Sequence, residues 1–275
     1  MTNSQQNTTQ PIGIFDSGIG GLTIAQAIMK LLPQENIIYF GDTAHFPYGE
    51  KSIAAIQSYS LKIANLLLQQ NCKLILIACN SASSAAYSLL KQHVGSQALV
   101  MDVIDPLVSW ISQNYAHQKT KMGLIGTKAT VHSNVYKKKI DALNLGIELS
   151  SYSTNLLASA IEEFGNHEVI NGLLSIYLEH PALKNIEALI LACTHYPVVK
   201  ERIAAYYNNK VDIIDSSDIV ALAVKSTLEH AKLLNTHKTG SDHFYISDNN
   251  LDAFKAGTKL FFNHEIALKP YPLWD

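Results

Sequence analysis

Short apolar runs of strand length alternate with helical patterns along the first third of the chain. The runs Ile12–Phe15, Ile37–Phe40 and Leu74–Ala78 are rich in β-branched and aromatic residues and are bounded by turn residues. Helical patterns fill residues 22–32 and 52–69 between them. This alternation is typical of βαβ units, so the pattern predicts an α/β fold built on a parallel sheet.

The second half of the chain repeats the same alternation. In chain order we expect a strand at Met122–Ile125, a helix near Ser133–Leu143, a strand at Ile147–Ser150, helices near Leu156–Phe164 and His167–Leu178, and strands at Ala188–Ala192 and Val211–Ile214. The remaining expected elements are a helix near Ile219–His230, a Thr/His/Gly-rich loop around Asn235–Ser241, and a final short strand and helix.

Two sequence segments occur twice, which indicates a duplicated unit. LILIACN at residues 74–80 resembles LILACT at residues 189–194, and GIFDS at residues 13–17 loosely parallels GLIGT at residues 123–127. The offsets are similar, 114 residues between Cys79 and Cys193 and 110 residues between the two initial glycines. We therefore expect two pseudo-symmetric α/β domains, each a mostly parallel sheet flanked by helices, with the active site in the cleft between them.

The elements after the second repeat could return to the first domain and make it discontinuous. On this reading residues 11–105 and 216–275 form the first domain and residues 106–215 the second, after a polar, disordered tail at residues 1–10. The length of 275 residues is compatible with two domains.

Composition excludes several classes of protein. Lys+Arg 21 against Asp+Glu 23 gives a net charge of -2, and the run Lys137–Lys139 is expected to be a solvated helix face, so nucleic acid is not an expected partner. The N-terminus lacks a secretory signal and the longest apolar stretches only reach strand length, so we expect a cytoplasmic protein without membrane contact. Cys72, Cys79 and Cys193 form no CxxC motif, which favours free thiols and no metal.

Polar and reactive residues follow the predicted strands, where ligands bind in open parallel sheets. These residues are Asp16-Ser17, Gly41-Asp42-Thr43, Cys79-Asn80-Ser81 and Cys193-Thr194-His195. A cysteine between a strand and a helix lies near unpaired N–H groups, which lower the thiol pKa. Cys79 and Cys193 have this placement, whereas Cys72 precedes a strand and is expected to be structural.

Two equivalent thiols from two pseudo-symmetric domains favour a nearly symmetric reaction. In a racemisation, one group removes a proton from one face of a carbon and another group returns a proton to the opposite face. A thiol-hydrolase dyad of Cys193 and His195 leaves Cys79 unexplained, and buried cysteines often act only as small apolar side chains.

Other polar positions have plain structural alternatives. Asp16 and Asp42 could be turn residues, and Pro47-Tyr48-Gly49 could be a turn that presents backbone donors. The glycines at residues 18–21 begin like a dinucleotide fingerprint, but Thr23 stands where the third glycine belongs. A turn that presents Asp16 and Ser17 is the better interpretation.

Five motifs in order carry a resemblance to a known family: FDSGIGGL (residues 15–22), YFGDT (39–43), PYG (47–49), ACNSAS (78–83) and CTHYP (193–197). With them the chain resembles the glutamate racemases of the aspartate/glutamate racemase superfamily over most of residues 12–265. The resemblance implies glutamate as substrate, a cleft between two facing domains, no pyridoxal phosphate and no other cofactor. It also implies that the protein supplies D-glutamate for bacterial peptidoglycan. A homodimer is one assembly that the sequence allows.

The resemblance also assigns roles to residues. Cys79 would deprotonate D-glutamate with help from Asp16, Cys193 would deprotonate L-glutamate with help from His195, and Asp42 is a further catalytic candidate. The implied substrate contacts are Asp16, Ser17, Tyr48, Gly49, Asn80, Ser81, Thr194 and His195, with Thr127 or Thr130 as additional candidates.

Two acidic positions depart from the family pattern. LASAIE at residues 157–162 replaces a segment that usually reads LVPLVE, so Glu162 is the catalytic nominee and Glu163 its competitor. Asp102 stands where the family often has glycine, and the sequence suggests no role for it. The alternative functions are racemisation of another acidic amino acid such as aspartate, and noncatalytic amino-acid binding.

Overall fold

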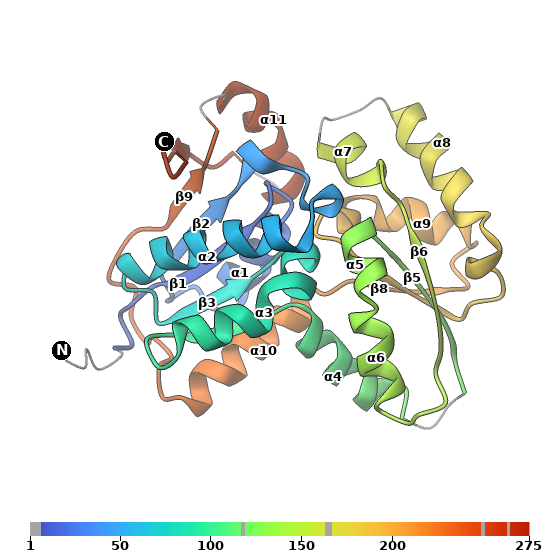
Figure 1. The fold of residues 1–275 in the computed structure, drawn as a ribbon, viewed down its shortest axis with the longest axis horizontal. Coiled ribbons are helices and arrows are strands. Elements are labelled where there is room, and N and C mark those ends of the chain that lie inside the picture. Colours follow the sequence, from blue (N-terminus) through green and yellow to red (C-terminus); the bar gives the residue numbers. More distant parts are fainter. Residues whose placement is uncertain (1–6, 117–118, 163–166, 249–250, 263–264, 275) are drawn as a thin grey trace.

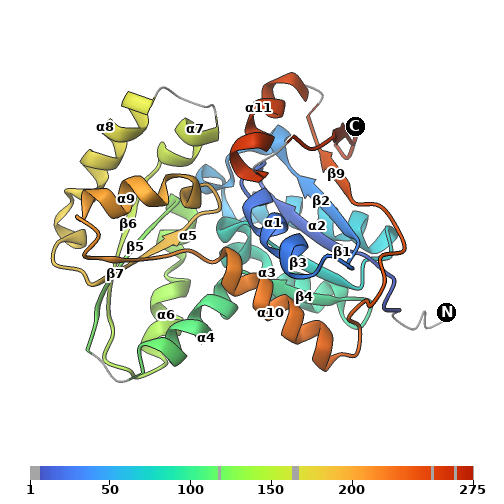
Figure 2. The same ribbon diagram turned by 180° about the vertical axis from the view of Figure 1, so that it is seen from behind.

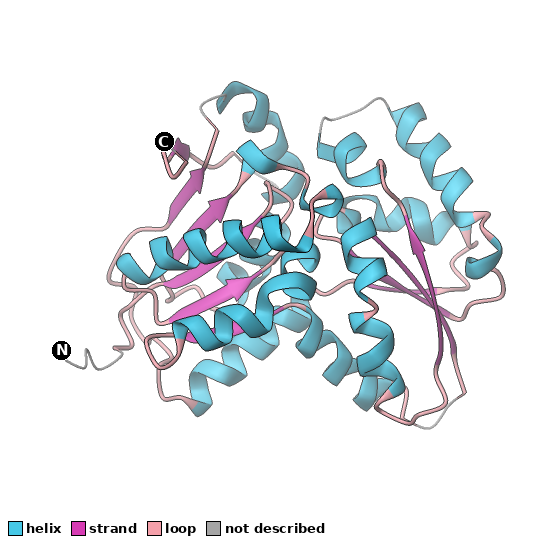
Figure 3. Cartoon of the chain, viewed as in Figure 1, coloured by secondary structure: helices cyan, strands magenta, loops and turns pink. Residues whose placement is uncertain are grey.

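Two parallel sheets lie side by side with helices around them (Figures 1 and 3). The structure is a computed structural model that describes residues 7–116, 119–162, 167–248, 251–262 and 265–274. The first sheet has the strand order β10 (Leu268–Pro270), β9 (His243–Ile246), β2 (Ile37–Gly41), β1 (Ile12–Asp16), β3 (Leu74–Ile77) and β4 (Leu99–Asp102). The second has the order β6 (Glu148–Ser153), β5 (Lys121–Gly126), β7 (Ala188–Ala192) and β8 (Asp212–Ile214).

The two sheets share one arrangement of strands. In the first, β1 pairs in parallel with β2 on one side and β3 on the other, and in the second β5 pairs in the same way with β6 and β7. Cys79 follows β3 and Cys193 follows β7, so the two thiols come from equivalent strand ends. The predicted α/β fold with two pseudo-symmetric units is confirmed.

Helices cover both faces of the first sheet because its strands are apolar on both sides. α2 (Ile53–Gln69) and α3 (Asn80–Val94) cover the face seen in Figure 1. α1 (Leu22–Leu31) and α10 (Ser217–His230) cover the opposite face, seen in Figure 2. Along β1, Ile12 and Ile14 pack into one apolar cluster and Phe15 into the other.

Most of the remaining helices lie beside the second sheet. These are α5 (Lys128–Ser133), α6 (Val135–Asp141), α7 (Leu157–Glu162), α8 (His167–Leu178) and α9 (Lys200–Tyr206). α4 (Ile104–Asn114) contacts α10 and α3 of the first unit and α6 of the second. α11 (Leu251–Phe262) contacts α1. No helix in the described parts of the chain is both long and apolar enough to span a bilayer.

Several predicted elements differ in detail. The helix expected at 133–143 is α6, and α5 before it was not expected. Asn134 adopts a left-handed conformation (φ 56°), which separates the two helices. β4 and α4 were not anticipated, and the C-terminal segment contains a second strand, β10, beyond the one expected.

The chain crosses between the sheets twice, after β4 and again between β8 and α10. The strands β9 and β10 join the first sheet, and the division into domains at residues 105 and 216 stays a prediction. The N-terminal prediction is wrong for residues 7–10, where the Lys73 Nζ donates to the Thr8 carbonyl at 2.5 Å and the Asn36 amide donates to the Thr9 carbonyl at 3.3 Å. Residues 1–6 lie outside the described part of the chain.

Candidate active site

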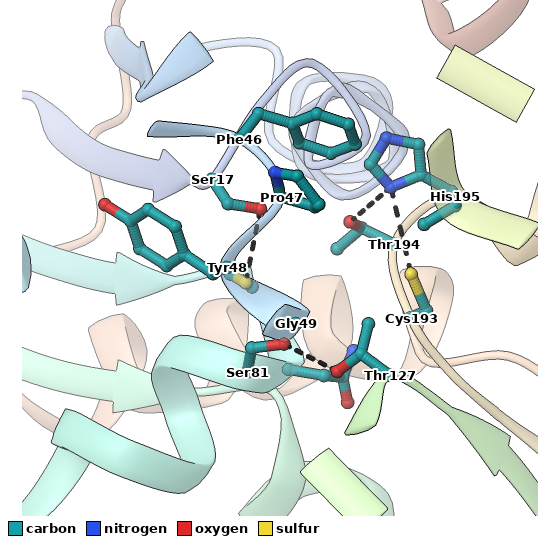
Figure 4. A pocket seen from close by; sticks show the side chains of 13 residues that line it. Ser17, Phe46, Pro47, Tyr48, Gly49, Ser81, Thr127, Cys193, Thr194 and His195 are labelled. Carbon is teal, nitrogen blue, oxygen red and sulfur yellow. Dashed lines mark hydrogen bonds between the residues drawn. The ribbon is translucent and has the colours of Figure 1, made fainter. Parts of the chain in front are cut away.

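A cavity of about 280 Å³ lies where the ends of β1 and β3 face the end of β7 (Figure 4). It brings together nine of the residues that the sequence nominated and adds Thr127 from the weaker candidates. Its lining consists of Ser17, Phe46, Pro47, Tyr48, Gly49, Cys79, Asn80, Ser81, Thr127, Ala158, Cys193, Thr194 and His195. A wider hollow of about 910 Å³ adjoins it, and Gly49 lines both.

The first wall of the cavity carries Cys79, which occupies the N-cap position of α3. Its thiol donates a hydrogen bond to the Ser17 hydroxyl at 3.6 Å. Burial, and next the charge of Asp16, raise the pKa of the Cys79 thiol to about 12. The predicted lowering is therefore wrong for Cys79, because loss of solvation outweighs the backbone N–H of Ala82 at the helix start.

The opposite wall carries Cys193, which is part of a chain of three groups. Its Sγ lies 3.8 Å from Nδ1 of His195, and Nε2 of the same ring is hydrogen-bonded to Oε2 of Glu162. Burial alone lowers the pKa of His195, but the charge of Glu162 and the bonds to Cys193 and Glu162 raise it well above its ordinary value. The His195 ring therefore holds its proton tightly, between the sulfur of Cys193 and the carboxylate of Glu162.

Asp16 connects the two walls from behind the cavity. It is fully buried, accepts the Gly18 N–H at 3.1 Å, and accepts the Thr194 hydroxyl at 3.3 Å. Burial raises the pKa of Asp16, and the positive charge of His195 opposes that shift. Asp16 and Glu162 do not line the cavity, so each acts on it through a neighbour: Asp16 through Thr194 and by its charge on Cys79, and Glu162 through His195.

Asp42 is not placed to act on a substrate, which corrects the catalytic role expected for it. Its carboxylate accepts hydrogen bonds from Tyr48 at 2.6 Å, Ser247 at 2.7 Å and Trp274 at 2.7 Å, and lies 3.0 Å from Nδ1 of His45. It is fully buried behind Tyr48 and outside the cavity lining. Its contacts hold Tyr48 in the cavity wall and attach the C-terminal segment to the same wall.

The glycine-rich loop after β1 allows the second unit to approach closely. A Cβ on Gly20 would lie 2.4 Å from Nδ1 of His195, and one on Gly18 would lie 2.9 Å from both carboxylate oxygens of Glu162. These positions therefore require glycine to seat the His195–Glu162 pair. The sequence interpretation assigned this loop only the presentation of Asp16 and Ser17.

Hydroxyl and amide groups complete the lining. The Ser81 and Thr127 hydroxyls are 2.8 Å apart (Figure 4). The Thr127 hydroxyl is also 3.1 Å from that of Thr130, which does not line the cavity. Within the described residues, the buried Nδ2 of Asn80 and Oε1 of Glu162 have no hydrogen-bond partner. Buried polar groups are normally paired, so an unpaired amide donor in a cavity wall is available to a ligand.

The other nominated residues lie elsewhere. Cys72 is buried beneath Gly13, and burial raises the pKa of its thiol to about 12, in line with an inert side chain. Burial, and next the charge of Asp105, raise the pKa of Asp102 to about 7. Glu163 lies outside the described residues. Among the residues described, no group of three or more His, Cys, Asp and Glu side chains is arranged to hold a metal ion.

Comparison with known proteins identifies the family. The model of the Asp/Glu/hydantoin racemase family matches residues 22–224. A glutamate racemase from Geobacter metallireducens is 37% identical over 239 residues, which cover 86% of this chain and 87% of the relative. The chain belongs to the Asp/Glu/hydantoin racemase family.

Solved racemase structures agree with the fold. The glutamate racemase from Francisella tularensis in complex with D-glutamate is 40% identical, has a TM-score of 0.87, and is matched over 97% of this chain and 99% of its own. The racemase from Thermus thermophilus in complex with β-chloro-D-alanine is 35% identical, has a TM-score of 0.83, and is matched over 96% and 98%. The predicted resemblance to glutamate racemases is confirmed.

Two lining residues, Phe46 and Ala158, escaped the sequence analysis, and Pro47 was named only as part of a turn. Phe46 directly precedes that turn, and Ala158 lies at the start of α7. Phe46 packs against the ring of His195, with ring centroids 5.4 Å apart. Their apolar side chains carry no chemical signal of their own, and only proximity to a nominated motif could have suggested them.

Proposed function

We propose that this protein interconverts L-glutamate and D-glutamate by two-thiol acid–base chemistry without a cofactor. The observation that carries the proposal is the pair Cys79 and Cys193, which lie at equivalent strand ends of two pseudo-symmetric units and line one cavity. A substrate carbon between them presents one face to each sulfur. The kinship with glutamate racemases supports the choice of glutamate.

In the direction from L- to D-glutamate, Cys193 is the base. Its thiolate takes the α-proton and becomes a thiol, the electron pair remains on the substrate as a carbanion, and the Cys79 thiol gives its proton to the opposite face. The His195 imidazolium stabilises the starting thiolate, and Glu162 keeps that ring charged and oriented. The raised pKa of Cys79 keeps its proton in place until the carbanion forms.

In the reverse direction, Cys79 is the base and Cys193 returns the proton. The Ser17 hydroxyl, 3.6 Å from the sulfur, can turn its own proton toward a Cys79 thiolate. Asp16 sets how readily that thiolate forms, because its negative charge raises the pKa of Cys79. A proton on Asp16 would remove this repulsion, so the same carboxyl favours the thiol when ionised and the thiolate when neutral.

The α-proton is far less acidic than a thiol, so the site must stabilise the carbanion. Ser81 and Thr127 carry hydroxyl groups in the cavity wall that can donate to the carbanion. In a small cavity sheltered from water such donors act more strongly than in bulk water.

The substrate is tested by following the optical rotation of L-glutamate and L-aspartate with the purified protein. We expect loss of rotation with glutamate and a much slower loss with aspartate. Preferential turnover of aspartate would overturn the choice of substrate, and binding of glutamate without turnover would identify a noncatalytic binding protein.

The cellular role is proposed from family membership alone. We propose that the protein works in the cytoplasm and supplies D-glutamate for peptidoglycan synthesis. A homodimer stays a prediction.

A further inference from the structure

Asn80 uses only one half of its side-chain amide within the protein. Its Oδ1 accepts a hydrogen bond from the Tyr136 hydroxyl at 2.7 Å, whereas its buried Nδ2 has no partner among the described residues. Asn80 directly follows Cys79 and lines the cavity. The oxygen of this amide is therefore used in a protein contact, and its NH₂ group is left as a free donor.

Tyr136 reaches Asn80 from the other unit. It lies on α6, beside the second sheet, and is 3% exposed. Burial, and next the charge of Asp102, raise the pKa of the phenol well above its usual range, so the hydroxyl keeps its proton. A neutral phenol that uses its proton needs an acceptor, and the carbonyl oxygen of Asn80 supplies it.

The hydrogen bond selects one of two orientations of the amide. With Oδ1 on Tyr136, the NH₂ group of Asn80 is the free half and suits a carboxylate. In the flipped orientation, a carbonyl oxygen would take the place of that donor and would repel a carboxylate.

We propose that Tyr136 is a positioning residue, which orients the Asn80 amide so that its NH₂ group binds a carboxylate of the amino-acid substrate. This assignment rests on the proposed function. It makes substrate recognition on the Cys79 wall depend on a side chain of the opposite unit. Tyr136 does not line the cavity, so its whole effect on the reaction passes through Asn80.

The test is a double-mutant cycle of Tyr136→Phe and Asn80→Ala with both glutamate enantiomers. Tyr136→Phe should raise KM about tenfold, equivalent to about 1.4 kcal/mol, and leave kcat within about twofold, because the carboxylate contact is the same in the ground and transition states. The double variant should be no worse than Asn80→Ala alone. Tyr207→Phe is the matched control, since its hydroxyl donates only to the Leu183 carbonyl, at 3.4 Å, and its KM should be unchanged.

Two results would overturn the assignment. One is an unchanged KM in Tyr136→Phe, whether or not kcat falls. The other is a rise in KM when Tyr136→Phe is added to Asn80→Ala that equals the rise it causes in the wild-type protein. Calorimetric Kd values for D-glutamate, measured on the same four proteins, keep this test separate from the proposed function. If the wild-type protein binds glutamate without racemising it, the proposed function fails, and the cycle is read in Kd instead of KM.

Discussion

Cys79 and Cys193 are equivalent by position and different by environment. Cys193 lies beside the His195 imidazole, which is paired with Glu162, whereas Cys79 lies beside a neutral hydroxyl and the repulsive charge of Asp16. This difference supports the proposed roles of Cys79 as the acid and Cys193 as the base in the direction from L- to D-glutamate. The sequence placed both sulfurs at strand ends, but Glu162 lies 33 residues from His195, so this polarity depends on the folded chain.

Asp102 should make the folding stability of the protein depend on pH. Its pKa of about 7 lies above that of an unfolded aspartate, about 3.9, so the folded state binds the proton more tightly. Folding stability from this group is present at low pH and is lost as pH rises from about 4 to about 7. Asp102→Asn removes the titration, so its stability relative to wild type should grow by about 4 kcal/mol across this range.

Urea unfolding at pH 4, 6 and 8 measures that difference. Asp141→Asn is the control, because Asp141 is half exposed and pairs with Lys137 on the surface, and its difference from wild type should stay nearly constant. A constant difference for Asp102→Asn as well would show that Asp102 titrates normally in the folded protein.

At the scale of elements, the buried strands could be predicted from the sequence, whereas one partly buried strand and one short helix could not. Apolar runs such as Ile12–Phe15 and Ala188–Ala192 gave the buried strands correctly, because buried parallel strands are apolar on both faces. β4 was missed because only three of its four residues are apolar, Leu99-Val100-Met101 before Asp102, and so short a run does not stand out. α5 was missed because it is only six residues long and its one buried residue is Thr130, so it has no apolar pattern.

The glycine-rich loop before α1 should be sensitive to any added side chain at Gly20. In Gly20→Ala, the new methyl group would overlap the His195 ring, with 2.4 Å between Cβ and Nδ1, and backbone or ring must move. A displacement of about 1 Å at the Cys193–His195 pair should lower kcat/KM about 100-fold. Measuring both the racemisation rate and the thermal unfolding temperature of this variant will separate the loss of activity from a general loss of stability.

Gly172→Ala is the matched control for that variant. Gly172 lies inside α8, and an added Cβ meets no atom within 4 Å. The substitution should leave activity unchanged and stabilise the protein by about 0.4–1 kcal/mol. Wild-type activity in Gly20→Ala would mean that the glycine loop does not control the approach of the two units.

The whole molecule is a duplicated sheet that carries a nearly symmetric reaction. The duplication was legible in the sequence, since the two cysteine segments repeat at the same place in the strand order. The features that distinguish the two units could not be read from the sequence. The C-terminal strands β9 and β10 extend only the first sheet, and Trp274 donates a hydrogen bond to Asp42 across 232 residues of sequence. A contact of that span has no local sequence signal.

Hydrogen–deuterium exchange at the α-carbon tests the two-thiol account most directly. In D₂O the wild-type protein should place deuterium in both glutamate enantiomers while it racemises them. Cys79→Ser retains the base for L-glutamate and should label only that enantiomer without inverting it, and Cys193→Ser should label only D-glutamate. Near-normal racemisation by either variant, or labelling of the same enantiomer by both, would contradict the assignment of one thiol to each face.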